Sequence, residues 1–379
     1  MAEDLEREIL LLAGRLALGT VTDAEALVYF HAPLPWERLF ERAAEEGMSG
    51  LLAAQLQRLA LLYQYDFPLD RFAQAHHHLF ARNGAFFAEL TALHKELQQH
   101  GLQIVLLKGG ALIETVYQGH LGLRPLSDLD LLIKDTDLPC IKDILWRWGF
   151  RPPSPASNFW THGPTAFDLH TDLLGATRIR RRALAFQFDT AALWREATRL
   201  EAHDPTLLLL SPPHQFLHLA VHALKHSFSR LIWLVDLGLV WQQLRWEDLL
   251  LQAIASGTLR PLLYVLLSLQ RLMGVEVPPH VWAALPQLGR LEQRFLEAVA
   301  RRRGLVALGE VMVAFSIAER RRRWGYLVEF SFPERHVLAE LFPTTPAWLV
   351  YPRRLRQLLA TGLREGSKSL CALGKWRQA

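Results

Sequence analysis

The sequence predicts an α+β fold in which a small mixed sheet is embedded in a predominantly helical protein. Two observations support this prediction. Apolar residues recur at helical spacing before residue 100 and after residue 205. Between these parts, short apolar runs alternate with helical segments and with Gly- and Pro-containing turns. We therefore expect a helical N-terminal region at 1–100, a sheet domain at 101–204 and a helical C-terminal domain at 205–379.

The N-terminal region is predicted to be helical throughout. Leu5, Ile9, Leu12 and Leu16 form an apolar stripe with the period of an α-helix, and similar patterns follow as far as residue 100. A helix with one apolar face must bury that face against another element. We expect these helices to pack as a cap on the domain that follows.

The sheet domain is predicted from short apolar runs and from the residues that end them. Gly101 and Gly109 bound the first run, which is branched and apolar as in a buried strand. Proline-rich sequence between two such runs is typical of a loop. Strands are predicted at 103–107, 128–133 and 165–174, helices at 111–118 and 135–149, and loops at 119–127 and 150–160.

The composition is that of a folded protein, because half of the 379 residues are hydrophobic and 21% are charged. The net charge of +4 suits anionic ligands such as nucleotides and is too small to indicate nucleic acid. Cys140 and Cys371 are far apart, which argues against a disulfide framework or a cysteine zinc site. The N-terminus does not resemble a signal peptide, and no uncharged apolar run reaches about 18 residues. We expect a cytoplasmic protein without membrane insertion.

Two aspartates open the second predicted strand. Asp128 and Asp130 are two residues apart, so a strand places both carboxylates on one face. Adjacent carboxylates repel each other unless a cation neutralises them, and Mg²⁺ or Mn²⁺ prefers such oxygen ligands. A third carboxylate on a neighbouring strand would complete a site for two metal ions. Asp168 is our candidate for this position, and Asp172 is the competing one.

The turn after the first strand is a candidate phosphate-binding element. Lys108 supplies a positive charge, and Gly109 and Gly110 let the backbone of a helix N-terminus approach an anion. Arg124 could reach a triphosphate from the loop before Asp128, since a guanidinium matches phosphate oxygens. Ser127 could donate a hydrogen bond to phosphate or cap the strand entry.

The run from residue 106 to 133, LLKGGALIETVYQGHLGLRPLSDLDLLI, resembles the polymerase-β-like nucleotidyltransferase superfamily. The pattern of that superfamily is a Gly-Gly or Gly-Ser turn followed by a strand with Dx[DE]. Within it, the chain is similar to a bacterial group described as nucleotidyltransferase family proteins. The similar segments are Lys108–Gly110, Arg124–Ile133, Asp168–His170 and the helical stretch from His218 to Asp236.

The resemblance implies the nucleotidyltransferase fold for the sheet domain and a role for several residues. Asp128, Asp130 and Asp168 would hold catalytic Mg²⁺, and Gly109 and Gly110 would face the triphosphate. The chain departs from many relatives in having Gly110 where they have serine, which removes one hydroxyl donor.

Four histidines recur every fourth residue after the sheet domain, at His214, His218, His222 and His226. On a helix they form one stripe. Three interpretations remain open: core residues, ligands of the nucleotide or acceptor (His222 above all), or a zinc site. His170 lies two residues after Asp168, so it would share the strand face of that aspartate and assist the metal site.

These features predict an enzyme that uses Mg²⁺ or Mn²⁺ to transfer a nucleoside monophosphate from a nucleoside triphosphate such as ATP. Pyrophosphate would be released. A small molecule, peptide or protein is the favoured acceptor, and nucleic acid such as RNA is left open as a less favoured one. One alternative is a degenerate nucleotide-binding or regulatory module without turnover. Another is metal-dependent glycosyl transfer from a sugar nucleotide, because a DxD pair also binds metal with diphosphate.

Overall fold

The structure is a computed structural model of the chain. It describes residues 2–31, 34–155, 157–175, 179–200, 206–300, 308–342, 344–346 and 348–360. The end of the expected C-terminal domain, beyond residue 360, and the expected domain boundary at 204 lie outside these ranges.

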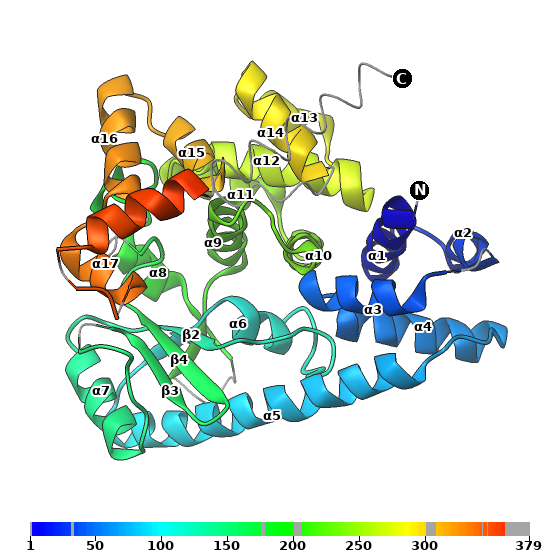
Figure 1. The fold of residues 1–379 in the computed structure, drawn as a ribbon, viewed down its shortest axis with the longest axis horizontal. Helices are drawn as coiled ribbons and strands as arrows, with labels where there is room; N and C mark the ends of the chain where they lie inside the picture. The colour runs from blue at the N-terminus through cyan, green and yellow to red at the C-terminus, as the bar shows by residue number, and fades with distance from the viewer. Residues whose placement is uncertain are drawn as a thin grey trace.

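The described elements before residue 100 are helices, and the last of them is the long helix that runs along the lower edge of Figure 1. Thr22 begins α2 with a capping box, in which its hydroxyl accepts from the backbone N–H of Glu25 and the Glu25 carboxylate accepts from the backbone N–H of Thr22. The elements are α1 (Ala2–Leu18), α2 (Asp23–Leu27), the 3₁₀ turn η1 (Val28–His31), α3 (Trp36–Glu45), α4 (Ser49–Tyr63) and α5 (Asp70–Gln99).

One mixed sheet of six strands follows, in the order β3-β4-β2-β1-β6-β5. Strand β1 is parallel to β6 and antiparallel to β2, and β2 is parallel to β4. The outer strands β3 and β5 pair antiparallel with β4 and β6. The strands are β1 (Ile104–Leu106), β2 (Leu129–Leu132), β3 (Phe159–His162), β4 (Thr165–His170), β5 (Thr198–Arg199) and β6 (Leu207–Leu209).

The expected α+β class is confirmed, and two details of the sheet differ from the expectation. Phe159 and Trp160 end a segment that was predicted to be a loop, yet they begin β3, which forms a hairpin with β4. The sheet also continues past residue 204, because Leu207–Leu209 pairs with β1. Both strands have only three or four residues, and their pairing depends on neighbours that local periodicity does not reveal.

The two faces of the sheet differ. Leu129 and Leu131 of β2 pack in an apolar core with α5 and α7. Side chains alternate along a strand, so Asp130 and Leu132 lie on the opposite face of the sheet. Leu132 packs there against Leu193 in a smaller core. The elements between the strands are α6 (Lys108–Glu114), α7 (Leu138–Arg147), η2 (Arg180–Leu184) and α8 (Thr190–Glu196).

The helices after β6 form a layer above the sheet, with α9 at its centre (Figure 1). They share one core with the N-terminal helices: Leu10 of α1, Leu56 of α4 and Val235 of α10 belong to the same apolar cluster. The elements are α9 (Pro212–Lys225), α10 (Leu231–Trp241), α11 (Trp246–Ala255), α12 (Leu259–Ser268), the π-turn η3 (Leu269–Met273), α13 (Pro279–Ala283), α14 (Arg290–Ala300), α15 (Leu308–Phe315), α16 (Arg320–Ser331) and α17 (Arg335–Leu341).

Among the described helices, none has the length and apolar character needed to cross a bilayer.

Candidate active site

Two acidic residues meet at the centre of the sheet. Asp130 and Asp168 are direct partners in the parallel pairing of β2 with β4. His170 lies two residues after Asp168, so it is on the same strand face. Its Nε2 lies 2.8 Å from Asp130 Oδ1 and 3.1 Å from Asp168 Oδ2. One ligand atom from each of the three residues lies within 4.8 Å of the others.

These three residues fit a divalent cation. Carboxylate oxygens are the ligands that Mg²⁺ and Mn²⁺ prefer, and an imidazole nitrogen is a further ligand for Mn²⁺. Burial alone would raise the pKa of Asp130, but the charge of Lys108 and the hydrogen bond with His170 outweigh it and lower that pKa. Asp130 is therefore an anion although it is only 5% exposed.

Asp128 stands beside this group, immediately before β2. Its carboxylate is not one of the three converging ligand atoms, and its Oδ1 accepts a hydrogen bond from Ser127 Oγ at 2.5 Å. Burial and the charge of Asp130 raise the pKa of Asp128. Repulsion between two neighbouring carboxylates has this effect, and a cation bound between them would relieve it.

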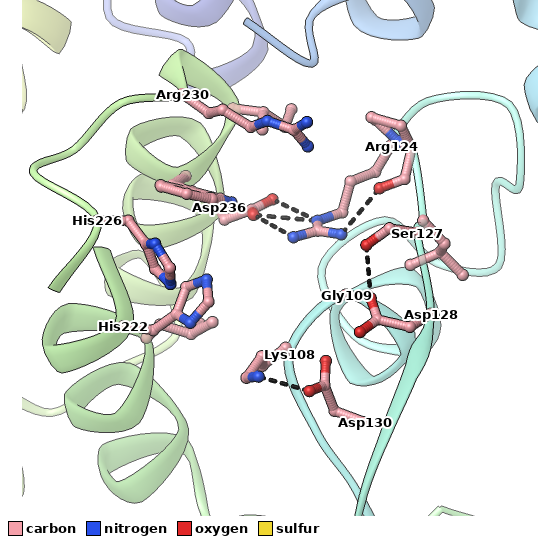
Figure 2. A pocket seen from close by; sticks show the side chains of 15 residues that line it. Lys108, Gly109, Arg124, Ser127, Asp128, Asp130, His222, His226, Arg230 and Asp236 are labelled. Atoms are coloured by element: carbon pink, nitrogen blue, oxygen red, sulfur yellow. Dashed lines mark hydrogen bonds and ion pairs between the residues drawn. The ribbon is translucent and has the colours of Figure 1, made fainter. Parts of the chain in front are cut away.

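Lys108 contacts the acidic cluster through Asp130. Its Nζ donates a hydrogen bond to Asp130 Oδ1 at 2.5 Å, as Figure 2 shows. Burial lowers the pKa of Lys108, but the charge of Asp130 outweighs it and raises that pKa. Lys108 begins α6 with a left-handed backbone, at φ 45°. The predicted lysine thus lies beside the acidic cluster and lines both of the cavities described below.

The two glycines after Lys108 are buried, and each has a packing reason to be glycine. A Cβ atom at Gly110 would lie 2.8 Å from side-chain atoms of Leu106 and Leu129, in the core of the sheet. A Cβ atom at Gly109 would collide with the guanidinium of Arg124. Only Gly109 of the pair lines a cavity.

Arg124 has a different partner from the triphosphate that the sequence suggested. Its Nε and Nη2 each lie 3.0 Å from Asp236 Oδ2, and Tyr117 Oη donates to Asp236 Oδ1 at 2.8 Å. Asp236 is completely buried, so its carboxylate requires a partner of opposite charge. This buried ion pair joins the loop before β2 to α10 (Figure 2). Arg124 also lines a cavity beside the acidic cluster, and its contact with phosphate stays a prediction.

Two adjoining cavities open on the acidic cluster. We call the first the Trp233 cavity, of about 350 Å³, and the second the Lys225 cavity, of about 440 Å³. Lys108, Asp128 and two histidines line both of them. The lining of the Trp233 cavity includes Lys108, Gly109, Ser127, Asp128, Asp130, His222, His226, Arg230 and Trp233, and that of the Lys225 cavity includes Lys108, Asp128, Asn158, Asp168, His170, Asp172, Arg182, His218, His222, Lys225 and His226.

The histidine stripe divides along α9. His214 is buried and its Nδ1 lies 2.8 Å from Ser211 Oγ, whereas His218 lines the Lys225 cavity. His222 and His226 line both cavities and lie opposite Lys108 (Figure 2). Burial lowers the pKa of His222 well below its usual value and that of His226 to about 4, so both rings are neutral near pH 7.

A zinc site on this stripe lacks support in the part of the chain that the structure describes. The only group of three metal-binding side chains found among those residues is the one formed by Asp130, Asp168 and His170. Asp172, the alternative third carboxylate, accepts a hydrogen bond from the backbone of Leu174 and is not in that group.

Trp233 also lines the Trp233 cavity, although its apolar sequence neighbours are typical of a core residue. Its ring centroid lies 5.1 Å from that of His222 and 5.5 Å from that of His226. The three rings form one aromatic wall of the cavity, and the exposed Arg230 lies at its edge. Its position in the sequence gave one signal for the cavity. Trp233 lies three residues after Arg230, which is about one helix turn, and Arg230 follows closely on the end of the histidine stripe.

A family model described as "Uncharacterised nucleotidyltransferase" matches residues 32–274. The match includes the acidic cluster, the Lys108 turn, α9 and α10. No match was found among curated proteins or solved structures.

Proposed function

Because this chain belongs to the uncharacterised nucleotidyltransferase family, we propose that it transfers a nucleoside monophosphate from a nucleoside triphosphate to an acceptor. The reaction would depend on Mg²⁺ or Mn²⁺ and release pyrophosphate. Membership of the family makes the chain a transferase, and the metal, the triphosphate and the acceptor are the proposed part.

The observation that carries the proposal is the convergence of Asp130, Asp168 and His170. Asp130 and Asp168 would hold the metal with Asp128 beside them, and His170 would bind it or orient the two carboxylates. A bound divalent cation would neutralise charge on the phosphates and favour displacement at phosphorus.

The nucleotide is assigned to the Trp233 cavity. Its aromatic wall of Trp233, His222 and His226 offers a face on which a base can stack. Arg230 and the Lys108 ammonium supply positive charge at the same cavity, which Gly109 also lines. Arg124 and Asp236, which form an ion pair, line the same cavity.

Asp168 is proposed to accept the proton of the attacking acceptor hydroxyl. It lines the Lys225 cavity, and the Trp233 cavity does not include it. His170 Nε2, 3.1 Å from Asp168 Oδ2, would keep this carboxylate oriented. The proton would leave the hydroxyl as its oxygen attacks the α-phosphorus.

The acceptor is proposed to be a small molecule, peptide or protein, with nucleic acid less favoured because the net charge is only +4. Use of a nucleoside triphosphate is consistent with a cytoplasmic location, which we propose as well.

The test is pyrophosphate release from each nucleoside triphosphate in the presence of Mg²⁺ or Mn²⁺. We expect Asp130→Ala to abolish release and Asp135→Ala to leave it unchanged, because the exposed Asp135 lies beyond the end of the same strand. Metal-dependent nucleotide binding without release would instead support a regulatory module. Consumption of UDP- or GDP-sugars would support glycosyl transfer.

A further inference from the structure

The Lys225 cavity contains one lysine that the proposed chemistry does not use and that has no ion-pair partner among the described residues. Three described cationic side chains line this cavity. Lys108 is paired with Asp130, and Arg182 is paired with the buried Glu310 of α15. Lys225 is the last residue of α9, and its side chain is half-buried. Lys225 lines the cavity, and the amine of its side chain makes neither a hydrogen bond nor an ion pair with any residue in the described ranges.

An ammonium group in this position is costly without an anion. Arg182 and Lys108 are close enough to repel it, and the opposing attraction of Glu310 and Asp172 does not compensate for burial and this repulsion. The result is a pKa of Lys225 lowered to about 7. An anion that enters the cavity would favour the charged form and gain a contact that the protein itself does not make.

We propose that the Lys225 cavity is the acceptor site and that Lys225 binds an anionic group of the acceptor, a phosphate or a carboxylate. This inference rests on the proposed nucleotidyl transfer. It assigns to the acceptor a hydroxyl near Asp168 and a negatively charged group farther along the cavity, at the end of α9.

The arrangement of the two cavities supports this assignment. Both open on Lys108 and Asp128, while Asp168 and His170 line only the Lys225 cavity. A nucleotide in the Trp233 cavity and an acceptor in the Lys225 cavity would therefore meet at the acidic cluster. Displacement at phosphorus requires the attacking and leaving oxygens on opposite sides of the phosphorus atom, which two ligands in adjoining cavities allow.

The polar lining suits such an acceptor. Asn158, Thr171 and Asp172 border the cavity, so it can hydrogen-bond a polar molecule around its charged group. A neutral acceptor would bury Lys225 further without providing the partner that its ammonium lacks.

The proposal is tested by labelling the protein with pyridoxal 5′-phosphate. The amine of a lysine attacks the aldehyde carbon, water leaves, and borohydride reduces the resulting imine to a stable secondary amine. Mass spectrometry then gives the labelling rate of each lysine. We expect Lys225 to react at least about tenfold faster than the exposed Lys95, because a lysine of ordinary pKa has little free amine near pH 7.5.

Competing anions then identify the group that Lys225 recognises. Inorganic phosphate or acetate should slow labelling of Lys225 at least about fivefold and leave Lys95 unchanged; the more effective of the two indicates a phosphate or a carboxylate. The proposal fails if neither anion protects Lys225. It also fails if ATP with Mg²⁺ alone protects Lys225 as fully as it protects Lys108, since Lys225 would then be a nucleotide ligand.

Lys225→Gln provides the matched control for the label, which should disappear from that peptide while Lys108 and Lys95 react as before. The labelling result is independent of turnover. Protection of Lys225 by an anion in a protein that never releases pyrophosphate would overturn the proposed transferase chemistry and leave the anion site established. Pyrophosphate release without protection of Lys225 would support the transferase chemistry and overturn the anion site.

Discussion

Asp130 and Asp168 are direct partners on adjacent parallel strands, and the imidazole of His170 contacts both carboxylates. The pairing of β2 with β4 is therefore what builds the candidate metal site. Asp130 would be repelled by Asp168 if it had no other contact, and it is stabilised by Lys108 and His170. Four predictions concern this candidate metal site, the buried ion pair of Arg124 and the two cavities beside them.

His170→Ala should weaken metal binding about 10–100-fold, because ligands and the residues that orient them contribute on that scale. The measurement is titration with Mn²⁺, followed by the metal dependence of pyrophosphate release, and removal of the metal with EDTA should abolish release. His162→Ala is the matched control, since His162 lies on the neighbouring hairpin with its side chain 52% exposed. Equal affinities in the two variants would contradict the site.

Arg124→Met should destabilise the protein by about 3–5 kcal/mol, because it leaves the buried carboxylate of Asp236 without its partner. Urea denaturation gives the free energy of unfolding. The double variant Arg124→Met with Asp236→Leu should recover much of the loss, since it removes both charges. A normal stability combined with a large rise in KM for the triphosphate would instead restore the phosphate role first expected for Arg124.

Trp233→Leu should weaken binding of the nucleoside triphosphate by about 1–3 kcal/mol, because stacking of a base on an aromatic side chain contributes about that much. Equilibrium binding with Mg²⁺ present measures the effect. Trp146→Leu is the control, as Trp146 is 54% exposed on α7 and does not line either cavity. If both variants bind the nucleotide like the wild type, the assignment of the base to this wall is wrong.

Lys225→Met should be more stable than the wild type at pH 6, and the advantage should shrink as the pH rises. The pKa of Lys225 is lowered to about 7 in the folded state from its usual value near 10.5, so folding is penalised whenever the unfolded lysine is protonated. The full penalty applies below pH 7, decreases between pH 7 and 10.5, and is absent above that range.

Urea denaturation of both proteins across this pH range measures the difference in the free energy of unfolding. His226 does not obscure it: its folded-state pKa of about 4 keeps the ring neutral in the folded protein, and its titration in the unfolded chain is the same in both proteins and cancels in the difference. A constant difference between the two proteins from pH 6 to 10 would contradict the lowered pKa.

Much of the fold could be read from local pattern. The strand at Ile104–Leu106 follows from a short branched run between glycines, and the strand at Leu129–Leu132 from an apolar run opened by acids. Phe159–His162 and Leu207–Leu209 were not recognised as strands, since each has only three or four residues and is stabilised mainly by the strand beside it. Such pairing is a long-range property.

The parts of the candidate site that depend on neighbouring residues were predictable, and the contacts between distant segments were not. A period of two placed Asp128 with Asp130 and Asp168 with His170, and both statements depend only on neighbouring residues. Arg124 was assigned to phosphate because a guanidinium in a loop near acids suits that role. That assignment stays a prediction, but the ion pair of Arg124 with Asp236 was not predicted. Asp236 is 112 residues later in the chain, and a contact of that separation has no local signal.

The sequence by itself therefore determined which residues are candidates for the chemistry and which strand face Asp130, Asp168 and His170 occupy, because alternation of side chains is built into the backbone of a strand. Only the tertiary structure decided which charges meet. The parallel register of β2 with β4 brought Asp130 to Asp168, α10 supplied the partner of Arg124, and the path of α9 across the site left Lys225 facing a cavity. These outcomes depend on packing between distant segments, where burial makes each charge require a partner.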